Sequence, residues 1–322
     1  MRRETAVALV IALSLPAVAA PAQTHLARPI RVIIGFPPGG GIDIVARVMA
    51  PRLTESLGQP IVIDNRPGAG GLIGTDLAAK AAPDGHTVFF GTIGNLSVNP
   101  LLYSRLSFDM ARDFAPVTHV ASVSSALLVH PAFPVKTVPD LIAVARSKPG
   151  QINFYSSGIG GTPHLAAELF NLMAGVKLTH VPYQGSAPGL VAITGGHVQV
   201  TFGALLSGLP LIKSGRLRGI ATLGKARSAL LPDLPTVADT LPGYEVINWY
   251  GMVVPKATPR PVIARLQGEV AKVLRLPEVR DNLVAQGAEP VGSTPGEFAA
   301  FMKTDMARWE KVIKEAGIGI KN

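Results

Sequence analysis

Several loops of this 322-residue chain combine glycines with hydroxyl or amide side chains, directly before a segment with helical periodicity. The first N–H groups of a helix have no partner within the helix and lie at the positive end of its dipole. They can therefore hold a carboxylate or phosphate without a cationic side chain. The loops thus predict a site for a small anion. Its candidate residues are Phe36, Pro38, Gly39, Gly40, Gly41, Asp43, Thr92, Asn95, Ser156, Ser157, Gly160, Gly161, Thr162, His164, Tyr183 and Gln184.

The stretch Ser156–His164 is the strongest single candidate among these loops. Thr162 is expected to cap a helix, with Pro163 at the first helical position, where a missing N–H breaks no hydrogen bond. A later loop places the aromatic ring of Tyr183 and the amide of Gln184 just before another helix start. Both loops are typical of anion sites built from backbone groups.

Two further loops allow either a binding or a purely structural interpretation. In Phe36–Asp43, three consecutive glycines would let a ligand approach and Phe36 would cover it. A plain turn, with Asp43 stabilising the helix start, explains the same residues. Thr92 and Asn95 follow a predicted strand and would either donate to a ligand oxygen or satisfy the turn.

An enzymatic function finds little support in the sequence. No serine lies in a GxSxG elbow, no HExxH is present, and the seven histidines are isolated rather than at metal-ligand spacing. The chain has no cysteine, so thiolate chemistry and disulfides are excluded. We therefore expect no enzyme, no metal and no cofactor. The alternative is a secreted hydrolase using Ser156 or Ser157 with His164, although no nearby acidic residue would orient that histidine.

Nucleotide and nucleic-acid binding are also disfavoured. The glycine-rich run at Asn65–Gly74 differs in spacing from a GxGxxG fingerprint and contains Pro67, which argues against a dinucleotide oxidoreductase. The formal net charge is +9, but the basic residues are scattered singly over predicted helices and form no run. No nucleic-acid partner is expected, although the positive field would attract an anionic ligand.

The first residues resemble a secretory signal peptide. Arg2 and Arg3 precede an apolar run from Ala6 to Ala20, and small residues offer a cleavage site near positions 19–23. The run is too short for a membrane-spanning helix, which needs roughly 20 apolar residues. We therefore expect a periplasmic or secreted protein, with residues 1–23 outside the fold.

The remaining chain alternates β-branched runs with amphipathic runs, which predicts the α/β class with mainly parallel sheets. Since single cores stop growing near roughly 250 residues, two lobes are expected. We assign residues 24–123 plus 243–322 to the first lobe and 124–242 to the second, with a two-crossing hinge near 121–126 and 240–248. The predicted strands are Arg31–Phe36, Pro60–Asp64, Thr87–Gly91, Ser125–Val129, Asn153–Ser156, Leu178–Pro182, Val198–Phe202, Gly219–Thr222 and Val246–Val254. The predicted helices are Ile42–Leu57, Thr75–Ala82, Val138–Ser147, Pro163–Ala174 and Ala187–Thr194.

Two more helices are predicted near the C-terminus. Thr258-Pro259 and Thr294-Pro295 each place a hydroxyl at the cap, and Glu297 completes a capping box with Thr294. The apolar residues of the last helix share one face, which we expect to pack on the first lobe. They are Phe298, Met302, Met306, Trp309 and Ile313.

Five motifs are spread over nearly the whole chain after residue 23. They are Phe-Pro-Pro-Gly-Gly-Gly at 36–41, Asn-Arg-Pro-Gly-Ala-Gly-Gly at 65–71, Gly-Gly-Thr-Pro-His-Leu-Ala at 160–166, His-Val-Pro-Tyr-Gln-Gly-Ser-Ala-Pro at 180–188 and Gly-Ser-Thr-Pro at 292–295. In this order and spacing they resemble the Bug family, the periplasmic solute receptors of tripartite tricarboxylate transporters. The resemblance implies a type II periplasmic-binding-protein fold, whose two lobes close on a ligand like a Venus flytrap.

The resemblance also implies how a ligand is held. Backbone N–H groups and ordered waters from the loops Phe36–Gly41 and Ser156–Thr162 would hold a carboxylate. The family's ligands are di- and tricarboxylates, amino acids and aromatic acids, and its partners are membrane transporter subunits or a sensor. We expect a monomer. Gly203 stands where the family usually has an acidic residue, so a ligand amine would lose a partner there. Asn95-Leu96-Ser97 replaces the commoner Thr-His-Ala.

Overall fold

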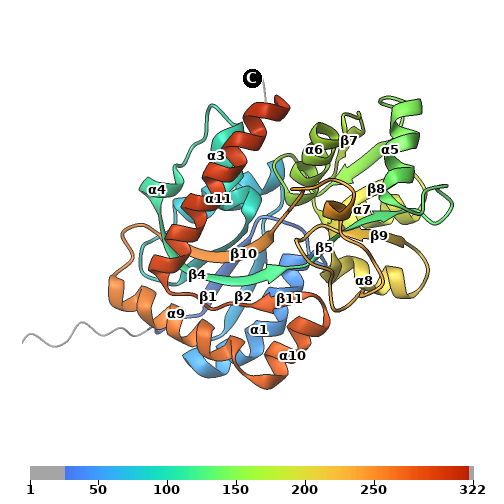
Figure 1. Ribbon diagram of the computed structural model, residues 1–322. Coiled ribbons are helices and arrows are strands. Elements are labelled where there is room, and N and C mark those ends of the chain that lie inside the picture. The colour runs from blue at the N-terminus through green and yellow to red at the C-terminus, as the bar shows by residue number, and fades with distance from the viewer. Residues whose placement is uncertain (1–25, 319–322) are drawn as a thin grey trace, which may run out of the picture.

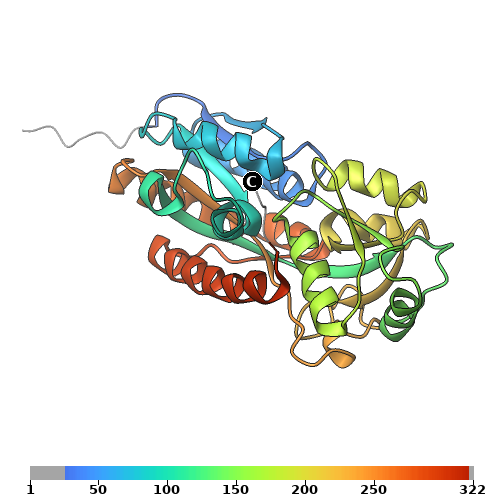
Figure 2. The same cartoon turned by 90° about the horizontal axis from the view of Figure 1, so that it is seen from above.

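The computed structural model describes residues 26–318, and the predicted signal peptide lies outside these residues. Figure 1 shows two lobes side by side, with the first in blue, teal, orange and red and the second in green and yellow. Figure 2, turned by 90°, shows the same division from above. Within residues 26–318, no helix has the length and apolar character needed to cross a membrane.

The first lobe is built on a six-stranded sheet. In spatial order its strands are β11 (Ala288–Pro290), β4 (Phe114–Val123), β10 (Asn248–Pro255), β3 (Thr87–Thr92), β1 (Ile30–Ile34) and β2 (Ile61–Asn65). One face is covered by α1 (Gly41–Leu57), α9 (Arg260–Leu274) and α10 (Pro277–Ala285). The other face carries α2 (Leu72–Ala79), the π-helical turn Gly94–Val98, α3 (Asn99–Leu102), α4 (Met110–Asp113) and α11 (Pro295–Ala316).

The second lobe is built on a five-stranded sheet. In spatial order its strands are β7 (Thr179–Pro182), β6 (Asn153–Ser156), β8 (Val200–Ala204), β5 (Ser125–Val129) and β9 (Arg218–Thr222). One face packs on α5 (Val138–Ser147) and α6 (Thr162–Ala174), and the other on α7 (Ser186–Thr194) and α8 (Leu205–Lys213). Short 3-10 turns lie at Ala69–Gly71 and Val237–Asp239.

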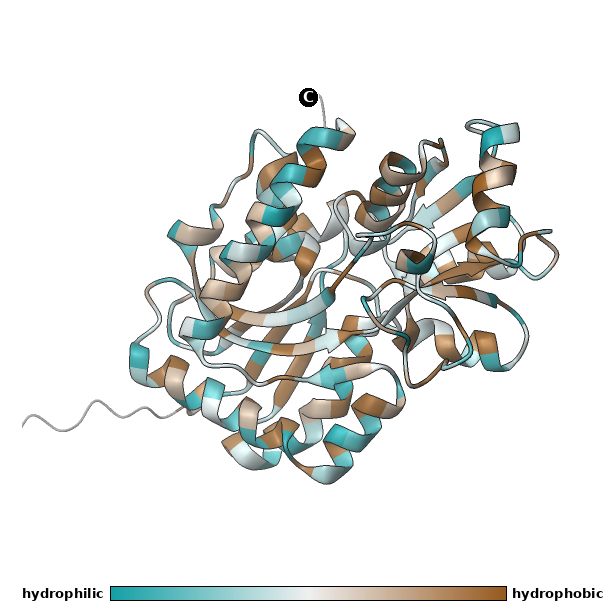
Figure 3. Ribbon diagram, viewed as in Figure 1, coloured by the Kyte–Doolittle hydropathy of each residue, from teal (hydrophilic) through white to brown (hydrophobic). Residues whose placement is uncertain are grey.

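Strands of both sheets are buried on two faces, which explains their continuous apolar sequences. In β1, Ile33 packs with the core under α2 and α11, while Val32 and Ile34 point to the opposite core under α1 and α9. Figure 3 shows the same arrangement, with brown hydrophobic residues on the strands and teal residues on the outer sides of the helices.

The predicted α/β class and the two lobes are confirmed, but the sheets are mixed rather than mainly parallel. β1 pairs parallel with β2 and β3, and β6 pairs parallel with β7 and β8. β10 runs antiparallel to β3 and β4, and β5 runs antiparallel to β8 and β9. The antiparallel strands β5 and β10 are those that follow a crossing of the chain from one lobe to the other. There the chain enters a sheet directly, without the crossover helix that a parallel connection needs.

The chain passes between the lobes where the sequence predicted a hinge. Ser124 separates β4 from β5, inside the predicted range 121–126, and the return leads into β10 at the end of the predicted range 240–248. The Ser124 N–H donates to the Gly287 carbonyl at 2.7 Å, and its carbonyl accepts from the Leu205 N–H at 2.8 Å. The lobe boundaries at 124 and 242 stay a prediction.

Most predicted elements form, and the capping predictions have mixed outcomes. The predicted capping box of Thr294 in α11 is present, and Thr137 forms a second capping box at the start of α5. Thr258 is not the cap of α9: its hydroxyl donates to the Pro255 carbonyl at 2.7 Å, and the helix begins two residues later, at Arg260. The sequence reasoning also missed α8 and α10 and did not predict the long strand β4.

Candidate functional site

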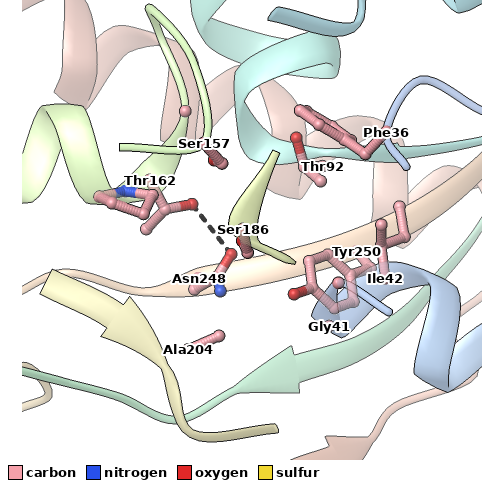
Figure 4. Close-up of a pocket in the computed structure, with 13 residues that line it drawn as sticks. Phe36, Gly41, Ile42, Thr92, Ser157, Thr162, Ser186, Ala204, Asn248 and Tyr250 are labelled. Carbon is pink, nitrogen blue, oxygen red and sulfur yellow. Dashed lines mark hydrogen bonds between the residues drawn. The ribbon is translucent and has the colours of Figure 1, made fainter. Parts of the chain in front are cut away.

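A small cavity of about 40 Å³ lies between the two lobes (Figure 4). The first lobe contributes the loop after β1, the end of β3 and the start of β10, and the second lobe contributes the starts of three helices and the loop before α6. Its lining residues are Phe36, Gly40, Gly41, Ile42, Thr92, Ser157, Gly161, Thr162, Pro163, Ser186, Ala204, Asn248 and Tyr250. The cavity is small because the lobes already touch around it.

Four helices begin at the cavity: α1, α6, α7 and α8. None of them has a side-chain cap, whereas α5 and α11 each have a threonine capping box. Among the described residues, the backbone N–H groups of Gly41, Thr162 and Ser186 have no hydrogen-bond partner. Uncapped N–H groups need a partner, so this wall of the cavity attracts an anion.

Thr162 is not the helix cap that the sequence predicted. The cap position is Gly161, and Thr162 is the first helical residue of α6. Its hydroxyl is therefore free to donate to the Oδ1 of Asn248 at 2.9 Å, as the dashed line in Figure 4 shows. Because α6 belongs to the second lobe and Asn248 to β10 of the first, this hydrogen bond joins the lobes inside the cavity.

The cavity lining carries no charged side chain. Its polar groups are hydroxyls and one amide, from Thr92, Ser157, Ser186, Asn248 and Tyr250, in addition to Thr162. Burial raises the pKa of the Tyr250 phenol, although a hydrogen bond with Asn248 acts in the opposite direction, so the phenol stays protonated at neutral pH. The lining can donate hydrogen bonds to an anion and has no side chain to neutralise a ligand ammonium.

Asp43 lies beside the cavity and holds its loop in place. Its carboxylate accepts from the Gly39 N–H at 3.0 Å, the Arg47 Nε at 2.8 Å and the Asn65 Nδ2 at 3.1 Å. Burial alone would raise the pKa of Asp43, but the hydrogen bonds from Arg47, Gly39 and Asn65 together lower it. The Asn65 Nδ2 also donates to the Phe36 carbonyl at 2.9 Å, and this hydrogen bond fixes the start of the same loop. The structural interpretation of Asp43 is the one that these contacts favour.

The side chain of Asn95 holds the neighbouring loop at Gly70 in place. It is fully buried, its Oδ1 accepts from the Thr92 hydroxyl at 3.1 Å, and its Nδ2 donates to the Gly70 carbonyl at 3.0 Å. A Cβ on Gly71 would lie 2.4 Å from the Asn95 amide, so this close approach requires glycine. Thr92 reaches the cavity and Asn95 does not.

Two histidines that lie far apart for metal-ligand spacing in the sequence are brought together by the fold. The ring of His164 stacks on that of His180 at 4.1 Å, and His180 stacks on Phe154 at 5.0 Å. Burial lowers the pKa of His164 to about 3, with a further contribution from His180, and lowers the pKa of His180 to about 4. The Gly160 N–H donates to the Nδ1 of His164 at 3.2 Å. Both rings are therefore neutral and structural at neutral pH.

The hydrolase alternative has no support in this arrangement. Ser156 is fully buried, and its hydroxyl lies 2.6 Å from the Nε2 of His180 rather than near His164. Ser157 reaches the cavity, but His164 does not. No serine of this loop is therefore paired with His164, and the nearest carboxylate to that ring, Glu168, is 3.9 Å away with a pKa raised by burial.

Several loop glycines lie where the two lobes meet. A Cβ on Gly70 would stand 2.9 Å from the Ile159 carbonyl oxygen, and one on Gly94 would stand 2.9 Å from the Gly160 oxygen. Gly185 approaches Pro37 in the same way, at 2.6 Å from Cδ. Such distances exclude a side chain, so these glycines allow the lobes to close.

Seven of the predicted site residues line the cavity: Phe36, Gly40, Gly41, Thr92, Ser157, Gly161 and Thr162. Besides those already described, the remaining candidates lie outside it. Pro38, Gly39 and Gln184 are exposed, and Tyr183 packs edge-on against Tyr155 at 6.1 Å. Gly203 lies within β8, and a Cβ there would be 3.8 Å from the Tyr155 hydroxyl.

Sequence reasoning missed six lining residues: Ile42, Pro163, Ser186, Ala204, Asn248 and Tyr250. Ile42, Pro163 and Ser186 adjoin predicted loops and were recoverable as first-turn positions of helices. Ala204 ends β8 and is the N-cap position of α8, a helix that was not predicted. Asn248 and Tyr250 lie on β10, which the sequence reasoning treated only as an apolar strand. Because side chains alternate between the two faces of a strand, both point toward the cavity.

Comparison with known proteins identifies the family. Residues 45–318 match the family described as the tripartite tricarboxylate transporter family receptor. The chain belongs to this family. BugT of Bordetella pertussis is 37% identical to this receptor over 308 residues, which cover 94% of each chain. The predicted membership of the Bug family is confirmed.

Solved structures of related receptors share the fold. Rpa4515 of R. palustris, solved with adipate, has a TM-score of 0.89 at 39% identity and covers 91% of this chain and 99% of its own. MatC of Rhodopseudomonas palustris, solved with bound malate, has a TM-score of 0.86 at 31% identity and covers 89% and 99%. The type II periplasmic-binding-protein fold is thereby confirmed, and the receptor is a solute-binding protein of a periplasmic family.

Proposed function

We propose that the receptor binds a small organic acid in the cavity between its lobes, with a carboxylate at the starts of α1, α6 and α7. The observation that carries this proposal is the set of unpaired N–H groups of Gly41, Thr162 and Ser186, which come from three helices and two lobes. A carboxylate with two oxygens satisfies several such donors at once, directly or through waters.

The rest of the lining narrows the ligand class. Without a charged side chain in the cavity, the positive ends of the helices are the source of attraction for an anion. A ligand ammonium would meet no carboxylate, since the lining contains none, and Gly203, at the position where the resemblance implies an acidic residue, offers none beside it. The lining therefore favours a di- or monocarboxylate over an amino acid. The adipate of Rpa4515 and the malate of MatC are ligands of this kind.

The physiological role follows from the family. We infer that the chain is secreted through its N-terminal signal peptide, cleaved near residues 19–23, and acts in the periplasm without catalytic activity. It would deliver its ligand as a monomer to membrane transporter subunits or to a sensor. Closure of the lobes around the ligand would present the loaded state to that partner.

The test is isothermal titration with a series of linear dicarboxylates, hydroxy acids, monocarboxylates and amino acids. Ser186→Pro removes the first N–H of α7 at a position where proline is compatible with the helix, whereas Ser186→Ala keeps the N–H and removes only the hydroxyl. We expect one carboxylate class to bind, and Ser186→Pro to weaken it by roughly tenfold, the value of a charge-assisted hydrogen bond. Equal affinities of the two variants, or no carboxylate binding, would refute the proposed site.

A further inference from the structure

The last helix, α11, carries apolar residues beside its buried face that the core covers only in part. Sequence periodicity placed Met302 and Met306 on the same buried face as Phe298, Trp309 and Ile313. Phe298 and Trp309 are fully buried and Ile313 nearly so, but the two methionines are only partly buried. Their side chains line a groove to which α4 also contributes.

The groove has the dimensions and lining of a small-molecule site. Its volume is about 360 Å³, within the range of roughly 300–1,000 Å³ typical of ligand pockets. Its floor is formed by the buried residues Leu96, Phe114 and Val253, and α11 and α4 line its sides, each contributing methionine. Its lining residues are Leu96, Met110, Ala111, Phe114, Pro116, Val253, Lys256, Ala299, Met302, Lys303 and Met306.

The charges at the groove have a single sign. Lys256 and Lys303 are exposed lining residues, and among residues 26–318 neither ammonium group has a hydrogen-bond or ion-pair partner. The acidic residue within α4, Asp113, has its carboxylate occupied by the Arg112 guanidinium at 2.7 Å and by the Asp109 N–H at 2.7 Å. No acidic side chain lines the groove. It therefore complements a ligand with one negative head and an apolar body.

We propose that this groove is a second ligand site, for an anionic amphiphile with an unbranched alkyl chain, such as a medium-chain alkanoate. The alkyl chain would lie between Met110, Met302 and Met306, whose flexible thioethers adapt to its shape. The head would lie at Lys303 or Lys256. A protein helix is a poorer occupant, because stable protein interfaces bury about 800 Å² per partner, whereas this groove is a local pocket of about 360 Å³.

The groove is independent of the cavity between the lobes. The two sites share no lining residue, and every groove residue belongs to the α11 side of the first lobe. An alkanoate in the groove therefore needs no closure of the lobes. A negative result for binding in the groove would therefore leave the proposed function of the cavity between the lobes untouched, and the reverse also holds.

The methionines themselves supply the readout. The chain has seven, of which Met110, Met302 and Met306 line the groove, while Met49 and Met252 are buried elsewhere. In protein with 13C-labelled methionine methyl groups, decanoate should shift the three groove resonances and leave Met49 and Met252 unchanged. The dissociation constant should fall about fourfold per added methylene from hexanoate to decanoate, the value expected for burying a CH2 group.

Two charge reversals on α11 test the role of the lysine. Lys303→Glu should weaken decanoate by at least about tenfold, because it places a like charge beside the head group. Lys314→Glu makes the same change on an exposed residue of the same helix outside the groove and should have no effect. Ser186→Pro, at the other cavity, should also leave the shifts unchanged.

Three outcomes would overturn the proposal. If decyltrimethylammonium bound as tightly as decanoate, the negative charge of the head group would not contribute to binding. If the affinity did not depend on chain length, the alkyl chain would not be buried in the groove. Shifts that vanish in Ser186→Pro but persist in Lys303→Glu would assign decanoate to the cavity between the lobes.

Discussion

The hydroxyl of Thr162 donates to the Oδ1 of Asn248 at 2.9 Å and connects the first turn of α6 to the strand by which the chain returns to the first lobe. Both residues are almost fully buried. A hydrogen bond between the two lobes within this cavity exists only when the lobes are closed. It therefore couples closure to the geometry of the site.

Removing this bond should weaken ligand binding by favouring the open state. Thr162→Val keeps the shape of the side chain and removes the donor, so the Asn248 oxygen loses its partner. We expect a loss of affinity of about tenfold, corresponding to ~1.4 kcal/mol. Thr162→Ser keeps the hydroxyl and is the matched control. Identical affinities for Val and Ser in titration calorimetry would show that the bond contributes nothing to closure.

A methyl group at Gly94 should obstruct closure. Gly94 has no positive φ, but its Cβ would stand 2.9 Å from the Gly160 oxygen of the opposite lobe. We expect Gly94→Ala to lower ligand affinity by roughly tenfold and to reduce ligand-induced compaction in small-angle scattering. Gly268→Ala is the control, since nothing lies within 4 Å of its Cβ inside α9. That change should stabilise the protein by about 0.5–1 kcal/mol and leave binding unaltered.

Asp43→Asn should loosen the loop after β1. The carboxylate accepts from Gly39, Arg47 and Asn65, and hydrogen bonds to a charged group contribute about 1.5–3 kcal/mol. Because the folded pKa of Asp43 is lowered, its contribution is present above the unfolded pKa near 3.8 and is lost as pH falls below it. In urea unfolding, the parent protein should therefore have a larger free energy of unfolding than Asp43→Asn at pH 7. This difference should disappear near pH 3. A constant difference would contradict this assignment.

The stacked histidines should make the fold sensitive to mild acid. The folded pKa values, about 3 for His164 and about 4 for His180, lie below the unfolded value of 6.5. The unfolded chain therefore binds protons first, and stability falls as pH falls below 6.5. His180→Phe keeps a ring between Phe154 and His164 but cannot titrate. Between pH 7 and pH 5 it should lose less stability than the parent protein, by roughly 1–2 kcal/mol in denaturant titrations.

Asp305 should have the opposite pH dependence. Burial raises its pKa to about 6, although the Trp249 indole N–H at 3.1 Å and the nearby charge of Arg308 act in the other direction. Its stabilising contribution is complete below pH 3.8 and is lost as pH rises through 6. Asp305→Asn keeps an acceptor for Trp249 and removes the titration. It should raise stability at pH 7 by up to about 3 kcal/mol, with no gain near pH 4. An equal effect at both pH values would point to packing instead.

The sequence predicted the elements better than their assembly. Ser125–Val129, Asn153–Ser156 and Val138–Ser147 form with the predicted limits, because their periodicity and caps are local signals. Strand direction is not local: β10 reads as a simple apolar run, and its antiparallel pairing with β3 and β4 depends on where the chain re-enters the first lobe. The missed helix α8 begins directly after β8, with no capping residue to signal it.

By itself the sequence determined the α/β class, the two lobes, the glycine-rich helix starts and the family resemblance, because each depends on residue types and short spacings. Only the tertiary structure decided which of those residues face the cavity between the lobes. Asp43, Asn95 and His164 turned out to support the loops, while Asn248 and Tyr250 entered the cavity from a strand far along the chain. A site between two lobes is made by closure, and closure depends on contacts such as Gly94 against Gly160 that no local pattern encodes.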